Sequence, residues 1–162
     1  NPNPSWLFSM NNSLSYKGFE LSVFLQGIAG NKIYNANNID NTGMAAAYNQ
    51  TIDVLERWQG EGTSNSMPRA VFGDPNQNTR VSDRFVENGS YLRLKNITLS
   101  YTFPKQWLQK ARIENARLSL SCENVATITG YSGFDPEVGI NGIDQNRYPI
   151  SRTFSVGLNF NF

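Results

Sequence analysis

The hydrophobic and polar positions of the chain alternate with a period of two in five segments. Between residues 6 and 16 the even-numbered positions are mostly apolar and the odd-numbered positions mostly polar, as on the two sides of a β-strand. Lys17-Gly18 then predicts a tight hairpin, because glycine readily adopts a positive φ. The pattern predicts an all-β chain with strands over residues 5–16, 19–28, 90–103, 113–126 and 151–162.

Two long segments, residues 28–90 and 127–150, interrupt the alternation. Both are rich in Asn, Gly and Asp, and both are long for loops of a compact domain. A helix in the first segment is predicted from a candidate N-cap followed by apolar residues at helical spacing: Thr42, Met44, Tyr48, Ile52 and Leu55. Pro104 is expected to end the third strand and to begin a helical turn over residues 105–112.

The five strands have the properties of membrane-spanning strands. They are longer than the average globular strand of about five or six residues and reach the roughly 9–11 residues that a tilted spanning strand needs. Their apolar faces carry no charged residue, whereas a basic residue at mid-bilayer would cost about 2–4 kcal/mol. Short connections at one end and long ones at the other are typical of periplasmic turns and extracellular loops. A soluble carbohydrate-binding β-sandwich is the main alternative.

Aromatic residues gather near both ends of the predicted strands. Those near the short connections include Tyr16, Phe19, Tyr101 and Phe103, while Trp6 and Phe154 are placed near the opposite end. Aromatic rings at both water interfaces are typical of outer-membrane barrels. The predicted aromatic girdle therefore comprises Trp6, Tyr16, Phe19, Tyr101, Phe103 and Phe154.

Five strands are too few for a closed barrel, because the smallest membrane barrels have about eight. An open sheet edge in lipid would leave its backbone N–H and C=O groups without hydrogen-bond partners. The chain also does not begin with Met and carries no signal peptide. Residues 1–162 are therefore expected to be the C-terminal part of a larger barrel. A passive porin is a further alternative, and it would lack an upstream plug.

Composition narrows the function classes. The chain has 14 basic and 13 acidic residues, a net charge of +1, which argues against a nucleic-acid partner. It has no histidine and one cysteine, Cys122, so a disulfide within the chain is excluded. No catalytic Ser/His/Asp set, Cys/His pair, P-loop or dinucleotide-binding glycine pattern is present. The chain is therefore expected to be neither an enzyme nor a cofactor-binding protein.

Several blocks of sequence resemble one family of transporters. The longest runs from Arg84 to Pro104 and begins Arg-Phe-Val-Glu-Asn-Gly-Ser-Tyr. The others are residues 1–6 and 16–19, Arg57-Trp58, Pro68-Arg69, Glu123-Asn124, and residues 131–137 and 148–162. Together they resemble the SusC/RagA-type TonB-dependent outer-membrane transporters over nearly the whole chain.

This resemblance implies a multi-pass barrel of about 22 strands in the bacterial outer membrane, surrounded by lipid and closed by an N-terminal plug. It also implies import driven by TonB through a segment outside these residues, a SusD-like surface lipoprotein, and a glycan or peptide substrate. The C-terminus would be periplasmic. The sequence does not distinguish glycan from peptide, because specificity in this family rests on loops and on the lipoprotein.

The end of the last strand resembles the C-terminal signal read by the barrel-assembly machinery. Ser155, Gly157, Phe160 and Phe162 fit its pattern. An exposed strand with an aromatic face can pair edge to edge with a partner sheet. The two phenylalanines are equally compatible with an aromatic belt at the membrane interface.

The long loops hold the candidate contacts to a ligand or partner. Aromatic anchors are common at interfaces, and the candidates are Trp58, Tyr131, Phe134 and Tyr148. Packing within the loops is the alternative role for these rings. Four oxygen-bearing residues in the second loop also suggest a Ca²⁺ site: Asp135, Glu137, Asn141 and Asp144. They lack EF-hand spacing and are ordinary turn formers, so no metal is expected.

Overall fold

The computed structural model describes the backbone of residues 1–162 and every side chain except that of Ala111. The chain divides into two compact units. The sheet unit comprises Pro4–Asn31, Gly89–Gly130 and Pro149–Phe162. The loop unit comprises Asn1–Asn3, Lys32–Asn88 and Tyr131–Tyr148.

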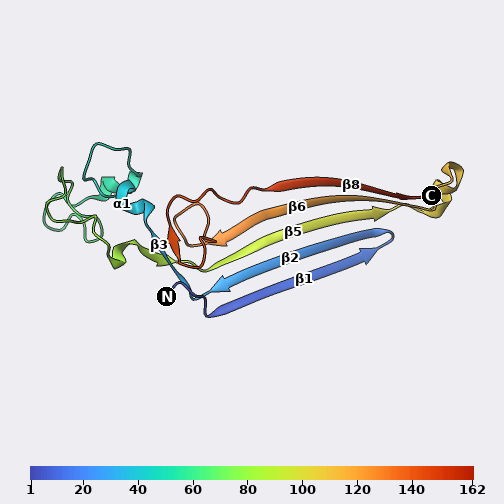
Figure 1. Ribbon diagram of the computed structural model, residues 1–162, viewed down its shortest axis with the longest axis horizontal. Coiled ribbons are helices and arrows are strands. Elements are labelled where there is room, and N and C mark those ends of the chain that lie inside the picture. Colours follow the sequence, from blue (N-terminus) through green and yellow to red (C-terminus); the bar gives the residue numbers. More distant parts are fainter. The chain divides into compact units, whose positions relative to one another are not determined.

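The sheet unit is a single antiparallel sheet of five strands (Figure 1). In spatial order the strands are β1 (Trp6–Tyr16), β2 (Phe19–Ala29), β5 (Tyr91–Thr102), β6 (Asn115–Thr129) and β8 (Thr153–Asn161). All five predicted strands are confirmed, with small differences at their ends. The first and last strands in sequence, β1 and β8, form the two edges of the sheet.

A tight turn at Lys17-Gly18 joins β1 to β2, as predicted. Both residues have positive φ, 46° and 88°, which is typical of the type I′ hairpin turn. The turn also touches the next strand, since the Thr102 amide donates a hydrogen bond to the Gly18 carbonyl at 2.8 Å. A Cβ atom at Gly18 would lie 2.9 Å from the Thr102 carbonyl oxygen, so this position requires glycine.

Strand register sorts the side chains into one apolar and one polar face. The apolar face contains rows of paired residues that cross the whole sheet, such as Leu14, Leu21, Leu99, Leu120 and Val156. The neighbouring positions form rows on the opposite face, such as Ser13, Ser22, Thr98, Ser121 and Ser155. Because side chains alternate along each strand, every pairing in these rows preserves the division between the faces.

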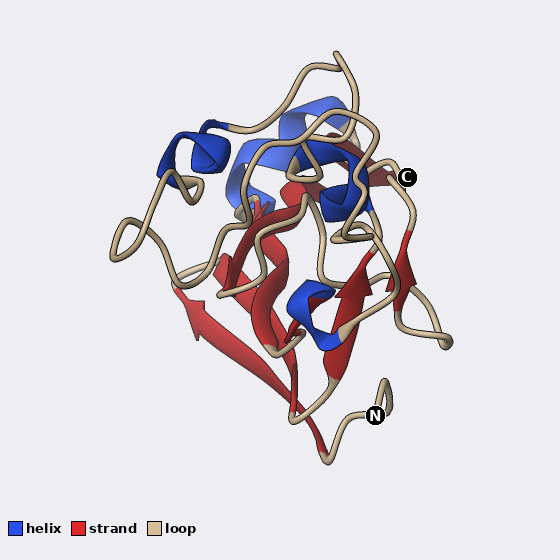
Figure 2. Cartoon of the chain, turned by 90° about the vertical axis from the view of Figure 1, so that its left-hand side faces the viewer, coloured by secondary structure: helices blue, strands red, loops and turns tan.

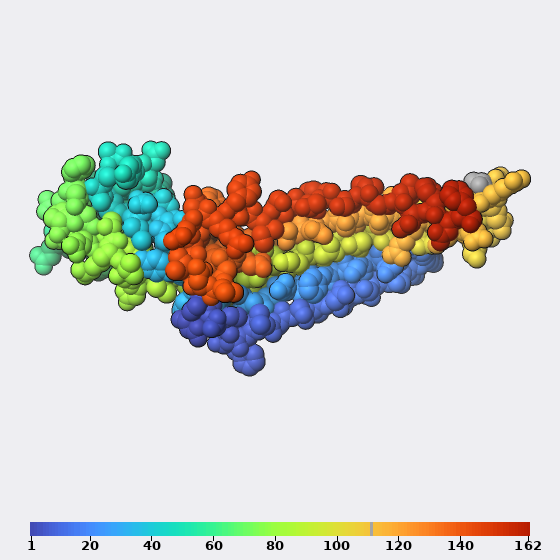
Figure 3. All heavy atoms as spheres, viewed as in Figure 1, coloured from blue at the N-terminus to red at the C-terminus, as the bar shows by residue number. Residues whose placement is uncertain are grey.

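The apolar face remains exposed to a degree unusual for a soluble protein. Met10 and Leu14 are 52% and 63% exposed, and Val156 and Leu158 are 74% and 56% exposed. The five strands lie side by side and are visible along their length in Figure 3. Within the described residues of the sheet unit there is no second sheet to cover this face. A face of this kind needs an apolar environment outside the chain.

A β-bulge resolves the change of phase in the sequence of β5. Against β2, Phe24 pairs with Asn96 and Leu25 with Leu94, so Lys95 is the residue inserted in β5. Against β6, Leu94 pairs with Ala126 and Asn96 with Glu123, so the extra residue there lies on β6. Leu92 and Leu94 precede the bulge, and the odd-numbered apolar residues from Ile97 onward follow it. One extra residue restores both groups to the same face, which is the usual effect of a bulge.

The connection between β5 and β6 contains short helical turns, α2 (Lys105–Leu108) and η3 (Gln109–Ala111). This confirms the helical turn predicted after Pro104. Pro104 occupies the N-cap position with φ −60° and ψ 137°. Among the described helices none is long and apolar enough to cross a membrane.

The loop unit is built from parts of both long connections. Its elements are β3 (Lys32–Asn35), α1 (Asn37–Asn41), η1 (Ile52–Glu56), η2 (Asp83–Phe85), β4 (Val86–Asn88) and β7 (Ile143–Asp144). The strands form a small sheet in which β3 pairs antiparallel with β4 and parallel with β7. Figure 2 shows the helices of the chain as short turns among the loops. The core of the loop unit contains the fully buried side chains of Ile33 and Phe85.

The prediction of a helix that begins at Thr42 is wrong. Helix α1 ends at Asn41, and Thr42 closes it, because the Thr42 hydroxyl donates to the Asn38 carbonyl at 2.7 Å. Met44 then adopts a left-handed φ of 53°, which stops helical propagation. Of the apolar residues that suggested the helix, Met44 is buried while Tyr48, Ile52 and Leu55 are exposed, so they do not share a packed face.

Candidate functional site

The four predicted loop contacts differ in accessibility. Tyr131 is buried, with 6% of its surface exposed, whereas Phe134 and Tyr148 are 78% and 87% exposed. Trp58 is intermediate at 37%. Phe134, Tyr148 and Trp58 therefore present rings that a ligand or partner can reach, while Tyr131 packs inside the loop unit.

Glu87 on β4 joins the two long connections. Its Oε1 accepts hydrogen bonds from Asn35 Nδ2 at 2.9 Å, Asn38 Nδ2 at 3.2 Å and Ser132 Oγ at 2.8 Å. Its Oε2 accepts from the Ser132 backbone amide at 2.9 Å. Asn35 and Asn38 belong to the first connection and Ser132 to the second, so one carboxylate bonds to both connections, which β3 and β7 also join.

A second link closes the loop that contains Tyr131. The Tyr131 hydroxyl donates to Asp144 Oδ2 at 2.6 Å, and Asp144 is itself buried. Burial raises the pKa of the Tyr131 hydroxyl, and the hydrogen bond and negative charge of Asp144 raise it further, as does the charge of Glu87. Tyr131 therefore acts as a neutral hydrogen-bond donor that fixes the loop.

Three of the four residues considered as a calcium site, Asp135, Asn141 and Asp144, accept hydrogen bonds from backbone amides of their own turns. Asp135 Oδ1 accepts from the Glu137 amide at 2.9 Å, and Asn141 Oδ1 accepts from the Ile143 amide at 3.5 Å. Asp144 binds Tyr131, as described above. Among the described residues no three His, Cys, Asp or Glu side chains are grouped as metal ligands.

One cavity of the loop unit, here called the asparagine pocket, has a volume of about 220 Å³. Its lining is largely amide and hydroxyl: Asn35, Asn37, Asn38, Asn41, Thr51, Asp53, Ser132, Gly133, Phe134 and Asn146. Asn35 is 2% exposed, and its Oδ1 has no hydrogen-bond partner among the described atoms. The exposed ring of Phe134 borders a cavity rich in hydrogen-bonding groups, which suits a polar ligand.

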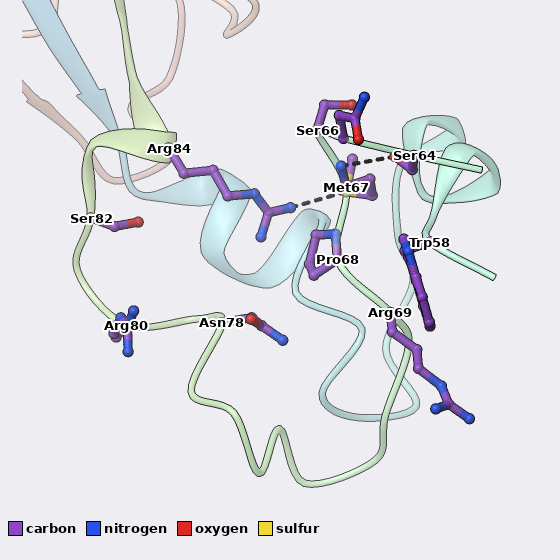
Figure 4. Close-up of a pocket in the computed structure, with 11 residues that line it drawn as sticks. Trp58, Ser64, Ser66, Met67, Pro68, Arg69, Asn78, Arg80, Ser82 and Arg84 are labelled. Carbon is purple, nitrogen blue, oxygen red and sulfur yellow. Dashed lines mark hydrogen bonds between the residues drawn. The ribbon is translucent and has the colours of Figure 1, made fainter. Parts of the chain in front are cut away.

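A larger cavity, here called the arginine pocket, has a volume of about 400 Å³ and is shown in Figure 4. It is lined by Trp58, Ser64, Asn65, Ser66, Met67, Pro68, Arg69, Asn78, Arg80, Ser82 and Arg84. Three of these side chains are guanidinium groups and none is a carboxylate. Among the described side chains, no carboxylate lies within ion-pair distance of the three arginines.

Arg84 is the best-anchored arginine of this pocket. Its Nη2 donates to Thr42 Oγ1 at 3.2 Å and contacts Met67 Sδ at 2.9 Å, a contact drawn in Figure 4. Its Nη1 is buried and has no acceptor among the described atoms. Burial lowers the pKa of Arg84, and the charge of Asp74 opposes this effect, so the guanidinium carries its charge beside the cavity.

Asp74 is a carboxylate close enough to influence the arginines electrostatically. It accepts hydrogen bonds from the Asn78 and Thr79 amides, both at 2.8 Å, and from Thr79 Oγ1 at 2.7 Å. Burial alone would raise the pKa of Asp74, but these hydrogen bonds, from Thr79 and Asn78, and the charge of Arg80 together lower it. Asp74 therefore organises its own turn and does not line the pocket.

The polar face of the sheet carries a few charged residues. Arg117 and Glu20 form an ion pair of 2.7 Å on this face. Arg93, which is 2% exposed, donates from Nε to Thr127 Oγ1 at 2.9 Å and lies 5.2 Å from the centre of the Tyr91 ring. The Arg117–Glu20 pair reaches from β6 over β5 to β2, and the Arg93–Thr127 bond joins the neighbouring strands β5 and β6, so both contacts stabilise the sheet.

The predicted girdle residues lie on the sheet or directly beside it. Phe19 and Tyr101 are register partners with ring centres 4.5 Å apart, and Tyr101 contacts Phe103 at 5.1 Å. Tyr16 pairs with Phe19. These four rings form one cluster at the end that carries the short connections.

Trp6 and Phe154, the other predicted girdle residues, occupy different rows of the sheet. Trp6 pairs with Ala29 at the far end of β1, and Phe154 pairs with Cys122. Barrel strands tilt by about 35–45°, so residues of one row do not share one membrane depth. The girdle therefore stays a prediction.

The residues of the predicted assembly signal lie on or directly after β8. Ser155 and Gly157 lie on the polar face of the sheet and Phe160 lies on the apolar face. Phe162 follows the end of the strand. The Phe160 and Phe162 ring centres are 6.5 Å apart, and Phe162 is 85% exposed. Recognition of these residues by the assembly machinery stays a prediction.

Sequence reasoning missed both pockets and the Glu87 junction. Trp58 was identified as a candidate contact, but its association with Arg69, Arg80 and Arg84 depends on loop folding. A weak signal was present, because Pro68-Arg69 and Arg84 belong to the blocks that carry the family resemblance. Glu87 lies in the same block, but its partners Asn35 and Ser132 are far away in sequence.

The fold defines a class of protein, the membrane-spanning β-barrels, of which this sheet is a segment. No family model matches the chain. It is 34% identical to the TonB-dependent receptor P3 of Formosa agariphila over 99% of its own length and 17% of that protein. It is 32% identical to the TonB-dependent receptor SusC of Bacteroides thetaiotaomicron, over 96% of the chain and 15% of that protein.

Solved structures agree with these relatives. The chain superposes on a RagAB peptide importer in the "closed-closed" state with a TM-score of 0.86 and 28% identity, covering 99% of the chain and 17% of that protein. For the "open-open" state the TM-score is 0.84. The resemblance is thereby confirmed: the chain is homologous along its length to a part of the SusC/RagA-type TonB-dependent receptors. It spans about one sixth of the length of the curated relatives it matches, 17% of P3 and 15% of SusC.

Proposed function

We propose that the protein containing this chain is an outer-membrane importer of large nutrients, driven by TonB. The observation that carries the proposal is the sheet with one uncharged, exposed apolar face and one polar face. The first suits lipid, and the second suits the water-filled interior of a barrel. The relatives named as TonB-dependent receptors and the RagAB peptide importer support the same function.

We further propose that a SusD-like surface lipoprotein is its partner and that the substrate is a glycan or a peptide. The exposed rings of Phe134 and Tyr148 are candidate contacts to this lipoprotein or to the substrate. In this arrangement the loop unit is extracellular, and the C-terminus of the chain is periplasmic. The polar face of the sheet lines the lumen.

Uptake by the full-length receptor tests this function. A strain lacking the receptor is complemented with the full-length gene, and uptake of labelled oligosaccharides and peptides is measured with and without functional TonB. We expect uptake only when both receptor and TonB are present, and co-purification of a surface lipoprotein with the receptor. Uptake that continues unchanged without TonB would instead indicate a passive porin.

The alternative of a soluble carbohydrate-binding β-sandwich has less support. A sandwich buries its apolar faces between two packed sheets, whereas the described sheet unit contains one sheet whose apolar residues are exposed. Catalysis is not part of the proposed function, since the relatives are named as receptors and importers.

A further inference from the structure

We propose that the arginine pocket binds an acidic sugar residue, carrying a carboxylate or sulfate group, of the oligosaccharide that the receptor imports. This inference rests on the proposed function and names the chemical class of its substrate. It is carried by the charge of the pocket and by the remaining lining residues, and an unsatisfied donor of Arg84 lies buried behind the wall of the pocket.

Charge is the first argument. Arg69, Arg80 and Arg84 all line the cavity, and no lining residue is acidic. Asp74, the carboxylate that influences Arg80 and Arg84, is already engaged by three hydrogen bonds within its own turn. A concave site with an excess of positive charge concentrates anions.

The unsatisfied donor is Nη1 of Arg84. This atom is buried and lacks an acceptor among the described atoms, whereas Nη2 of the same guanidinium is held by Thr42 and Met67. Buried polar groups are normally hydrogen-bonded. Nη1 has almost no accessible surface, so an oxyanion in the pocket supplies the missing acceptor once the Arg84 side chain turns toward the cavity. Guanidinium groups suit the paired oxygens of carboxylate and sulfate.

The other lining residues favour a sugar as the carrier of this anion. Ser64, Ser66 and Ser82 offer hydroxyl groups, Asn78 offers an amide, and Trp58 offers a partly exposed indole ring. The hydroxyl and amide groups suit hydrogen bonds to sugar hydroxyls. The indole ring suits the apolar face of a sugar ring. The volume of about 400 Å³ lies within the range of small-molecule sites.

An acidic peptide is the competing ligand, and the local backbone argues against it. Extended peptides commonly bind by adding a strand to an exposed sheet edge. The lining residues run from Trp58 to Arg84, and no described strand lies in that range. The pocket therefore offers side chains to its ligand and no strand edge.

Binding to the purified full-length receptor tests the proposal. Titration calorimetry in detergent compares trigalacturonic acid and a sulfated galactotriose with neutral galactotriose and with triaspartate. We expect both acidic sugars to bind more tightly than the neutral sugar, with affinities that fall as salt is raised. Arg84→Gln and Arg80→Gln should each weaken acidic-sugar binding about tenfold or more, as for loss of a charged hydrogen bond. Trp58→Ala should weaken binding of the acidic sugars by loss of stacking.

Arg147→Gln is the matched control, because Arg147 is an exposed arginine of the loop unit that does not line this pocket. All variants must assemble as the wild type does, as judged by gel mobility with and without heating. Absence of acidic-sugar binding, equal binding of the neutral sugar, tighter binding of triaspartate, or arginine variants with wild-type affinity would each overturn the proposal.

The outcomes separate this inference from the proposed function. A receptor that imports oligosaccharides with TonB but shows no preference for acidic sugars contradicts the pocket assignment alone. A receptor that binds acidic sugars through Arg80 and Arg84 but imports nothing contradicts the transport function alone.

Discussion

Glu87 is the side chain through which hydrogen bonds join the two long connections of the loop unit, beside the pairing of β3 with β7. Its carboxylate accepts four hydrogen bonds, from Asn35, Asn38 and two groups of Ser132. Asn35 is almost fully buried, and its Nδ2 also donates to Ser132 Oγ at 3.2 Å, so loss of Glu87 leaves one of its two amide hydrogens unsatisfied. This carboxylate therefore reinforces the association that the pairing of β3 with β7 also provides.

Glu87→Ala is expected to destabilise the association of the two connections by about 1–3 kcal/mol, the usual cost of leaving a buried polar group unpaired. Hydrogen exchange of the full-length receptor measures this effect. Exchange should increase in residues 131–137 and remain unchanged in the β-strands. Glu61→Ala, at an exposed position of the first connection, is the control. Equal exchange in the two variants would contradict the role of Glu87.

The hydrogen bond from Tyr131 to Asp144 should make the stability of the loop around Tyr131 sensitive to alkaline pH. An ordinary tyrosine ionises near pH 10, whereas burial and the hydrogen bond to Asp144 raise the pKa of Tyr131 in the folded loop. The stabilisation is therefore fully present below about pH 10 and is lost as the pH rises above the pKa of the unfolded chain. An alkaline-active protease should cleave residues 131–144 faster above about pH 10 than below it.

Tyr131→Phe provides the matched comparison. It removes the hydroxyl and leaves the buried Asp144 without this donor, so the loop should be cleaved faster at neutral pH, by an amount equivalent to about 1–3 kcal/mol. Its cleavage should then show less dependence on alkaline pH than that of the wild type. A wild-type loop whose cleavage rate is unaffected by raised pH would refute this account.

Strand faces determine which substitutions the sheet tolerates. Leu118 and Leu158 are register partners on the apolar face. Leu118→Arg and Leu158→Arg should impair assembly of the full-length receptor, because an arginine facing lipid costs about 2–4 kcal/mol at mid-bilayer. The fraction of heat-modifiable barrel on a gel measures assembly.

Ser119→Arg and Asn159→Arg are the matched controls on the polar face. Ser119 pairs with Gly157, and the missing side chain of this glycine leaves space for a larger one at position 119. Ser119→Arg should therefore reduce assembly only slightly. Asn159 pairs with Arg117, so Asn159→Arg places like charges opposite each other and should be slightly more harmful. Equal loss of assembly for both faces would mean that the faces are assigned wrongly.

The strands were predictable from sequence because their period of two reflects a physical division between two environments. The phase change within β5 was visible as well, but only the register against β2 identified Lys95 as the inserted residue of a bulge. The predicted helix failed because Thr42 bonds backwards to Asn38 and Met44 turns left-handed, which are local choices that spacing does not reveal. Likewise, the arginine pocket forms where loop segments come together, and the sequence of these segments has no periodic pattern that predicts their contact.

The sheet unit has two open edges, because β1 and β8 each pair with one described strand only. Open edges and an exposed apolar face are both aggregation hazards in water. In the proposed barrel, strands outside residues 1–162 pair with both edges.

Residues 1–162 expressed alone are therefore expected to aggregate in water and not to fold. Solubility after expression, followed by sizing and thermal melting, measures this. A soluble monomer with a cooperative melt would overturn both the barrel assignment and the transport function proposed from it. Reconstitution of the full-length receptor in detergent is the positive control.

The junction at Glu87 also constrains how such receptors diversify. Asn35 and Glu87 come from one loop and Ser132 from another, so each loop carries half of a shared hydrogen-bonded network. A chimera that takes only one loop from a relative with different residues at these positions separates donors from their acceptor. The two loops should therefore be exchanged as a pair in engineering and inherited as a pair in evolution, although about forty residues of sheet lie between them.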